Sequence, residues 1–323
     1  MRTLILRWLC LVVCLLAPNA DADVWKQHGF KPMGTQAYIE VLAKDDVQAQ
    51  QAIAVVEAEF ARVNALMSPW VESSELSLLN REAARQPVTV SAELWQLLAR
   101  ARQVSELSQG AFDITFASVG FKFDYRLHQK PTDAERKEQA QWINYRYVQL
   151  LPNNQVKFSR PQVKIDLGGI AKGYTVEQSI QLLKKMGIRH ALVSAGGDTR
   201  LLGDKAGRPW LVAIKHPRAE DKQVAQLPLV DQAISTSGDY ERYFIEDGKR
   251  YHHILDPKTG QSPTELMSVS VIGPDATQTD ALSTTLFVLG LERGMQLIEQ
   301  IPGYDAVFIR SDRQMFFSKG LQQ

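Results

Sequence analysis

Residues 163–178 read VKIDLGGIAKGYTVEQ, and this stretch decides how the rest of the chain is interpreted. Alternating apolar residues up to Asp166 predict a strand, and the segment from about Ala171 predicts a helix that Gly187 ends. Glycines before a helix N-terminus let an anion approach bare backbone amides, and Lys172 adds a positive charge. The spacing fits neither G-x-G-x-x-G nor a Walker A loop, so a plain strand-to-helix turn is an equal alternative.

Helical patterns flank this unit on its N-terminal side. Residues 45–68 and 91–110 have the apolar spacing of amphipathic helices. Asp45 or Asp46 is the expected N-cap of the first helix, Ser91 caps the second, and Gly110 ends it. Residues 121–145 are polar and aromatic and fit no regular pattern.

Short strand-like segments dominate from residue 147 onward, with a last long helix predicted at 279–300. Asn153-Asn154 and EDGKR (246–250) are typical hairpin turns. No low-complexity linker divides the chain after residue 22. We therefore expect one α+β domain over residues 23–323, with a substantial mixed or antiparallel sheet flanked by helices.

Residues 1–22 have the pattern of a secretory signal peptide. Arg2 and Arg7 begin it, an apolar run of about 15 residues follows, and Ala20-Asp21-Ala22 is a small-x-small cleavage site. The run is shorter than the about 20 residues of a membrane span. We expect cleavage after Ala22. A lipid anchor on Cys14 is disfavoured, because the residue before a lipidated cysteine is normally small and Val13 is not.

Composition excludes several classes of function. Both cysteines, Cys10 and Cys14, fall within the signal, so the rest of the chain has no disulfide, thiol nucleophile or thiolate metal ligand. A cysteine-free exported chain fits the periplasm. The formal charge is +1 for the whole chain and zero without residues 1–22, and no basic block suggests a nucleic-acid partner. An anionic ligand therefore needs a local site.

The predicted C-terminal helix contains a candidate metal site. Asp280, Ser283 and Thr284 are spaced i, i+3 and i+4, so their side chains share one face. A carboxylate with hydroxyls is a hard oxygen donor set that suits Mg²⁺ and suits zinc poorly. The alternative is helix capping by Thr279 or Asp280, with Ser and Thr bonding back along the helix, and the residues alone favour it.

Two glycine-containing stretches are weaker signals. SAGGDTR (194–200) leads a strand into Gly196-Gly197 and is typical of a hairpin turn. In AISTSGD (233–239), the hydroxyls of residues 235–237 could donate hydrogen bonds to a phosphate, although such a stretch is more often an ordinary loop.

The stretch RYHHILDPKTGQSP (250–263) places two of the six histidines side by side before an Asp-Pro turn. In a strand, His252 and His253 would point to opposite faces. A lone strand histidine is more often structural, but without cysteine an imidazole is the natural proton acceptor near pH 7. There is no nucleophile elbow, H-E-x-x-H or C-x-x-C, which argues against common hydrolases and zinc enzymes.

Taken together and in order, these stretches resemble the FAD:protein FMN transferase (ApbE) family, and the resemblance spans essentially all residues after the signal. Each motif is weak or moderate alone, and their fixed order is specific. The motifs are MGT (33–35), MSPWVESSELSLLN (67–80), GAFDIT (110–115), KIDLGGIAKGY (164–174), ALVSAGGDTR (191–200), STSGDYERYF (235–244), HHILDPKTGQSP (252–263) and TDALSTTLFVLG (279–290).

The resemblance implies an ApbE-like fold with a nucleotide cleft and a Mg²⁺-dependent transferase with FAD as substrate. Such an enzyme moves the FMN half of FAD onto a threonine hydroxyl of an exported flavoprotein or membrane redox subunit and releases AMP. His253 matches the reactive histidine that assists the threonine. The residues that match the family's nucleotide contacts are Met33, Trp70, Ala111, Phe112, Asp113, Asp166, Lys172 and Ile254.

The resemblance also implies the metal ligands, namely the backbone carbonyl of Gly169 with Asp280, Thr284 and Ser283. Two alternatives stay open. An FAD pyrophosphatase would use the same site with water in place of threonine and release free FMN and AMP. A non-catalytic flavin-binding protein would not need the Asp280/Thr284 pair together with His253.

Overall fold

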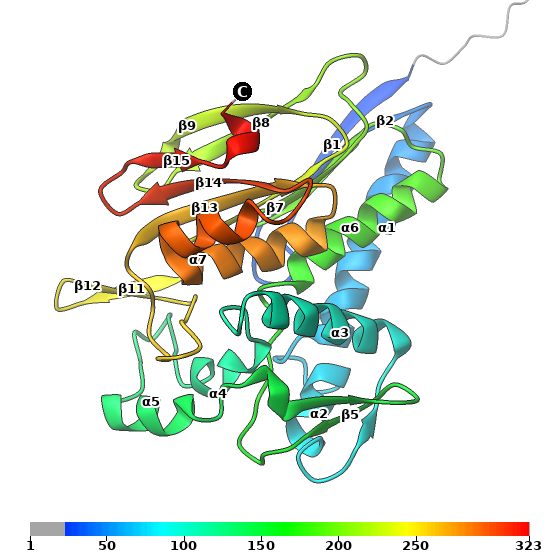
Figure 1. The fold of residues 1–323 in the computed structure, drawn as a ribbon. Coiled ribbons are helices and arrows are strands. Elements are labelled where there is room, and N and C mark those ends of the chain that lie inside the picture. The colour runs from blue at the N-terminus through cyan, green and yellow to red at the C-terminus, as the bar shows by residue number, and fades with distance from the viewer. Residues whose placement is uncertain (1–22, 323) are drawn as a thin grey trace, which may run out of the picture.

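The structure, a computed structural model, describes residues 23–322, and its main element is an eight-stranded sheet (Figure 1). The predicted signal peptide, residues 1–22, lies outside the described residues. All neighbouring strands pair antiparallel in the order β1-β2-β6-β7-β10-β13-β14-β15. The strands are β1 (Val24–Phe30), β2 (Ala37–Ala43), β6 (Ala191–Ala195), β7 (Asp198–Leu202), β10 (Ala233–Gly238), β13 (Leu266–Gly273), β14 (Asp305–Arg310) and β15 (Met315–Phe317).

Three long helices cover one face of this sheet: α1 (Asp46–Met67), α6 (Ala171–Lys185) and α7 (Ala276–Ile298) (Figure 1). The hairpin of β8 (Trp210–His216) and β9 (Ala219–Leu229) packs on the other face. Successive side chains of a strand point to opposite faces, so Leu202 packs under the helices and Leu201 under the hairpin. The predicted α+β architecture with an antiparallel sheet is confirmed.

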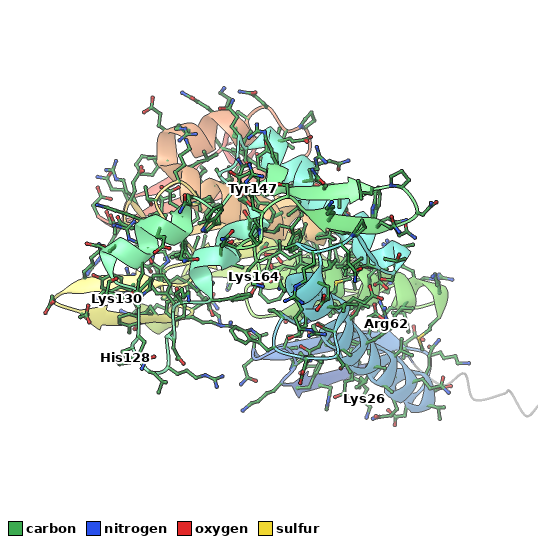
Figure 2. All side chains as sticks on the ribbon, turned by 90° about the horizontal axis from the view of Figure 1, so that it is seen from below. Lys26, Arg62, His128, Lys130, Tyr147 and Lys164 are labelled. Carbon is green, nitrogen blue, oxygen red and sulfur yellow. The ribbon has the colours of Figure 1, made fainter. Side chains whose placement is uncertain are left out.

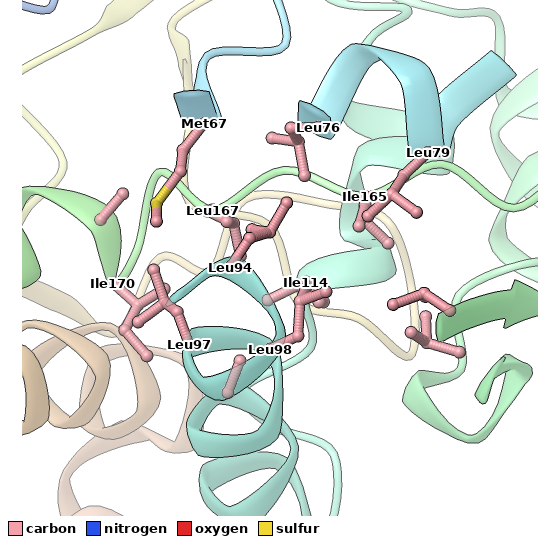
Figure 3. Packing of buried hydrophobic residues seen from close by; sticks show 14 of the residues in the cluster. Met67, Leu76, Leu79, Leu94, Leu97, Leu98, Ile114, Ile165, Leu167 and Ile170 are labelled. Atoms are coloured by element: carbon pink, nitrogen blue, oxygen red, sulfur yellow. The ribbon is translucent and has the colours of Figure 1, made fainter. Parts of the chain in front are cut away.

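A smaller region packs against the N-terminal ends of α6 and α7. It contains α2 (Glu75–Glu82), α3 (Ala92–Leu107) and a three-stranded sheet of β3 (Val88–Thr89), β5 (Gln155–Phe158) and β4 (Val148–Leu151). Figure 3 shows leucines of α2 and α3 around Ile165, Leu167 and Ile170. Ala281 of α7 belongs to the same buried cluster, so this core joins the smaller region to the helices on the sheet.

A hairpin of β11 (Tyr243–Glu246) and β12 (Lys249–His252) extends from the body beside residues 121–145 (Figure 1). That segment, which the sequence left unassigned, follows α4 (Ala117–Gly120). It contains an isolated β-bridge between Asp124 and Gln129 and then α5 (Asp133–Ala140) with a capping box. His128 stacks on Phe244, and Figure 2 shows His128 and Lys130 next to the hairpin. Short 3₁₀ turns complete the chain: η1 (Ile114–Phe116), η2 (Tyr145–Tyr147) and η3 (Lys319–Leu321).

The helix caps predicted at Asp45 and Ser91 are confirmed by hydrogen bonds from Gln48 N and Leu94 N. The strand predicted to end at Asp166 is wrong. Its alternate apolar residues are buried as in a strand, but the backbone pairs with the Asn80 side chain and the Ile114 carbonyl rather than with another strand. Strands β1 and β9 were not predicted. None of the helices between residues 23 and 322 is long and apolar enough for a membrane span.

Candidate active site

The candidate site lies where the N-terminus of α6 meets α7. The backbone N–H of Gly173 donates a hydrogen bond of 2.9 Å to Oδ2 of Asp280. The ammonium of Lys172 lies 2.7 Å from Oδ2 of Asp198 on β7 and 3.7 Å from Oδ2 of Asp280. The structure therefore brings together two residues predicted from sequence, Lys172 and Asp280, and adds Asp198 as a second buried carboxylate.

The close approach of α6 and α7 depends on the absence of a side chain at residue 173. A β-carbon there would lie 2.2 Å from the Ala276 carbonyl oxygen and 2.5 Å from Cβ of Asp280. The amide of Gly173 can therefore reach the carboxylate at the end where the helix dipole favours negative charge. The N-terminus of α6 therefore binds the Asp280 carboxylate, which is an anion of the protein itself.

Substitution of Gly173 by alanine is expected to lower the free energy of unfolding by about 3 kcal/mol or more, because the new methyl group overlaps backbone that cannot move alone. Urea unfolding measures the change. Gly29→Ala is the matched control, since a β-carbon at residue 29 has its nearest neighbour at 3.8 Å. A Gly173→Ala protein as stable as the control would contradict this helix contact.

Three hydroxyl groups gather beside Asp280. Oγ of Ser237 on β10 lies 2.9 Å from Oγ of Ser283 and 3.2 Å from Oγ1 of Thr284. A β-carbon at Gly169 would be 3.3 Å from Oγ1 of Thr284, so the backbone of residue 169 also lies close to the group. All four predicted metal-ligand residues thus come from two neighbouring segments, the turn before α6 and the largely buried turn of α7 that faces it.

The alternative of helix capping is wrong for Thr279 and Asp280, because α7 begins earlier and Asp275 is its N-cap. Back-bonding along the helix holds for Ser283, whose hydroxyl donates to the Asp280 carbonyl at 2.9 Å. Thr284 makes no such bond among the described hydrogen bonds and interacts with Ser237 instead. Neither helix capping nor back-bonding along α7 therefore accounts for the hydroxyl of Thr284.

The chemistry of these donors fits Mg²⁺. Asp280 and the Ser283, Thr284 and Gly169 oxygens are hard ligands, and a single carboxylate is typical of a Mg²⁺ whose other ligands are waters and phosphate oxygens. Within residues 23–322, no group of three or more histidine, cysteine, aspartate or glutamate side chains forms a metal site. A metal held here would therefore rely on hydroxyl and carbonyl oxygens in addition to a carboxylate.

Burial shapes the charges of this cluster. The pKa of Asp280 is raised by burial and by the neighbouring charge of Asp198. Burial alone would lower the pKa of Lys172, but the charges of Asp198 and Asp280 outweigh it and raise that pKa. A bound cation would favour the charged form of Asp280, which burial and Asp198 disfavour in the free protein.

His253 follows β12 directly, and its backbone N–H donates to the Arg242 carbonyl at 3.1 Å. Nδ1 of His253 is buried and has no hydrogen-bond partner among the described residues. Burial and the positive charges of Arg242 and Lys172 lower the pKa of His253 to about 3. The imidazole is therefore neutral near pH 7, the state that a proton acceptor requires.

His252 has the structural role expected for it. Its ring is buried, Nε2 lies 2.8 Å from the Pro263 carbonyl, and Phe287 packs edge-on against it. The two histidines do not alternate within one strand as predicted, because β12 ends at His252. His253 instead belongs to the turn that leads into residues 256–261, which closes with a β-bridge between Asp256 and Gln261.

Acidification is expected to destabilise the fold through His253. Its native pKa of about 3 lies below the value of about 6.5 in an unfolded chain, so the unfolded state binds the proton first as the pH falls. Compared with His253→Gln, the wild type should lose about 2–3 kcal/mol between pH 7 and about pH 4.5. Urea unfolding without flavin or divalent cations measures this difference, and a constant difference across that range would contradict the low pKa.

The residues predicted to contact the nucleotide fall into two groups. Met33 lies near α6, with its sulfur 3.9 Å from the Thr175 hydroxyl, and Phe112 approaches the backbone of Gly169. Ala111 is buried beside Phe112. Asp166 is half-buried, desolvation raises the pKa of its carboxyl group, and its Oδ1 accepts a hydrogen bond from the Gly168 amide at 2.6 Å. These residues surround the turn before α6.

The second group consists of Asp113, Ile254 and Trp70, whose contacts are with other parts of the protein. Asp113 accepts hydrogen bonds from the Thr115 and Tyr145 amides, so its oxygens are used within the protein. Ile254 packs in the buried cluster of β13 and α7. Trp70 is 75% exposed and contacts Phe121. Direct contact of these three side chains with a nucleotide stays a prediction.

Sequence reasoning assigned no site role to Asp198, only a general one to Ser237, and none to Arg242. The first two come together because β7 pairs with β10, with Asp198 opposite Ser235. Strand order of this kind is not visible in a local motif. The signal that could have found them is chemical, namely an acidic and a hydroxyl residue at glycine-rich ends of two strands.

A cluster of carboxylate and hydroxyl oxygens around Lys172, with a neutral imidazole nearby, lies on an antiparallel sheet covered by helices and has the chemistry of an enzyme site for an anionic ligand. Residues 33–308 match the ApbE family, and the chain belongs to that family. A FAD:protein FMN transferase of Haemophilus influenzae is 32% identical over 94% of this chain and 91% of its own length. One of Treponema pallidum is 34% identical over 90% and 85%.

Solved structures agree. The ApbE protein of Thermotoga maritima superposes with a TM-score of 0.86 at 32% identity, covering 93% of this chain and 98% of that one. The flavin transferase ApbE of Vibrio cholerae gives a TM-score of 0.82 at 27% identity, covering 93% and 99%. The family resemblance inferred from the motifs is confirmed, and the protein is an enzyme of the transferase class that acts in flavin transfer.

Proposed function

We propose that the enzyme moves FMN from FAD onto a threonine hydroxyl of an acceptor protein, with Mg²⁺ as cofactor and AMP as the second product. The observation that carries the proposal is the oxygen cluster of Asp280, Thr284 and Ser237 beside Lys172, in a chain whose relatives are named FAD:protein FMN transferase. The FAD pyrophosphate is doubly anionic, and a threonine hydroxyl is a poor nucleophile. Transfer therefore needs positive charge, positioning and a base.

In this reaction the threonine oxygen forms a bond to the phosphorus of the FMN half, and the bond from that phosphorus to the bridging oxygen breaks. The electron pair leaves with AMP, and the hydroxyl proton passes to Nε2 of His253. Asp280, Ser283, Thr284 and the carbonyl of Gly169 would hold Mg²⁺, which supplies charge compensation for the pyrophosphate. Bound pyrophosphate would also offset the charges of Arg242 and Lys172 and so raise the pKa of His253.

The acceptor and the compartment belong to the same proposal. The signal pattern of residues 1–22 and a cysteine-free remainder support export to the periplasm, with cleavage favoured over a lipid anchor. An acceptor in that compartment would be an exported flavoprotein or the exposed domain of a membrane redox subunit. The near-zero net charge argues against a nucleic-acid partner.

Intact-mass spectrometry tests the proposal. Residues 23–323 are incubated with FAD, Mg²⁺ and a flavin-domain protein that carries the acceptor threonine, and a matched acceptor with threonine replaced by valine is the control. The expected result is a covalent FMN adduct on the threonine acceptor alone, with one AMP per adduct. Free FMN and AMP without an adduct would instead support a pyrophosphatase, and unchanged bound FAD would support a flavin-binding protein.

A further inference from the structure

Arg242 lies between two parts of the site. It comes just before β11, and its carbonyl accepts the hydrogen bond from the His253 amide at 3.1 Å. Its Nη2 lies 3.6 Å from where a β-carbon of Gly34 would be, in the loop that contains Met33. The left-handed backbone at Gly34, with φ of 72°, keeps this position free of a side chain. The exposed guanidinium therefore spans from the His253 turn to the loop before β2.

The other cations near the site are neutralised. Lys172 is bound to Asp198 and Asp280, and Arg218 and Arg250 lie 2.6 and 3.7 Å from Asp239. No ion pair or side-chain hydrogen bond within residues 23–322 involves the Arg242 guanidinium. Its positive charge nevertheless acts on Asp166, Lys172 and His253. Arg242 is thus the cation at this site whose charge remains available to a ligand.

We propose that the Arg242 guanidinium binds the pyrophosphate of FAD on the side of His253, opposite the Asp280 and Thr284 oxygens. The assignment rests on the proposed function, since a pyrophosphate must occupy the site. A guanidinium presents two parallel N–H donors that match two phosphate oxygens, which an ammonium cannot do. Arg242 would stabilise the charge that gathers on the oxygens of the leaving AMP phosphate while the bond from the FMN phosphorus breaks.

This position also explains why Lys172 alone would be insufficient. The ammonium of Lys172 lies close to the carboxylates of Asp198 and Asp280, which cancel most of its attraction for a dianion. The proposed Mg²⁺ ligands on α7 lie on the same side of the site as Lys172. A second cation from the hairpin would place positive charge on both sides of the phosphate chain. Arg242 on the hairpin side and the α6–α7 cluster would then hold the two phosphates in one orientation for attack.

The test compares binding of FAD and of riboflavin, which has no phosphate, by flavin fluorescence in wild type, Arg242→Gln and Arg242→Lys. Lys249→Gln, an exposed cation on the same hairpin, is the matched control. Loss of a charged hydrogen-bond donor predicts about 10- to 100-fold weaker FAD binding for Arg242→Gln. Riboflavin binding should be unchanged, and Arg242→Lys should restore binding only in part. In Arg242→Gln, the rate of AMP release should fall by a larger factor than the affinity for FAD.

Three outcomes decide the matter. Equal FAD binding and AMP release in wild type and Arg242→Gln, with transfer intact, would overturn the role of Arg242 and leave the proposed function standing. Equal loss of FAD and riboflavin binding in a protein with wild-type thermal unfolding would also overturn it, because phosphate recognition would not be involved. A wild type that neither binds FAD nor forms an adduct would overturn the proposed function and this assignment with it.

Discussion

Replacement of His253 by alanine is expected to slow FMN transfer by about 10²- to 10⁴-fold, the range that loss of a general base produces. FAD binding should change little, because the role proposed for His253 is proton transfer and the groups proposed to hold the phosphates and the metal are other residues. AMP release under single turnover measures the rate, and flavin fluorescence measures FAD binding. The variant then separates binding from chemistry.

His28→Ala is a suitable control for this experiment, since His28 lies on β1 and pairs with Glu57 at 2.9 Å, outside the site. The control should transfer FMN as the wild type does. Undiminished turnover in His253→Ala would remove His253 from the mechanism. A variant that no longer bound FAD would assign His253 to substrate binding instead of proton transfer.

The low pKa of His253 and its proposed role are compatible. A pKa of about 3 in the free protein describes an imidazole that is buried beside cations, without the substrate. The dianionic pyrophosphate would stabilise the protonated form that appears during reaction. The site would thus hold the base neutral before FAD binds and favour its protonation only when the substrate is in place.

The parts of the fold that could be predicted are those specified by local chemistry. Helix α1 was predicted from its amphipathic pattern with Asp45 or Asp46 as the cap, and Asp45 is the cap found. The predicted stop of α6 at Gly187, with φ of 80°, is also found. The extended segment before α6 shows the limit. Its period-two apolar pattern predicts burial on one side correctly, but not whether another strand or a side chain such as Asn80 satisfies its backbone.

The same distinction holds for the candidate site. The i, i+3, i+4 spacing of Asp280, Ser283 and Thr284 is a local property, and the helix places them together. Lys172 was predicted as a phosphate ligand, but its ammonium is bound by Asp198, which reaches it through strand pairing. A long-range partner of this kind leaves no trace in the motif of the residue that it binds, and contact of Lys172 with a phosphate stays a prediction.

Replacement of Asp280 by asparagine is expected to weaken Mg²⁺ binding by more than about 10-fold. Mutation of a group that only orients a metal ligand already costs about 10- to 100-fold, and loss of a direct carboxylate ligand should cost at least as much. The amide keeps the size of the side chain but lacks the negative charge. Calorimetric titration with Mg²⁺ measures the affinity directly, without reference to activity, and FMN transfer should then require much more Mg²⁺.

Asp275→Asn is the matched control, because Asp275 is a carboxylate on the same helix that serves as its N-cap, and asparagine caps equally well. The control should bind Mg²⁺ as the wild type does. Thr284→Val provides a second variant, since it removes one ligand hydroxyl and leaves the charges of Asp280 and Lys172 in place. Wild-type Mg²⁺ affinity in folded Asp280→Asn and Thr284→Val proteins would place the metal elsewhere, because neither the charge nor the hydroxyl of α7 would then contribute to binding.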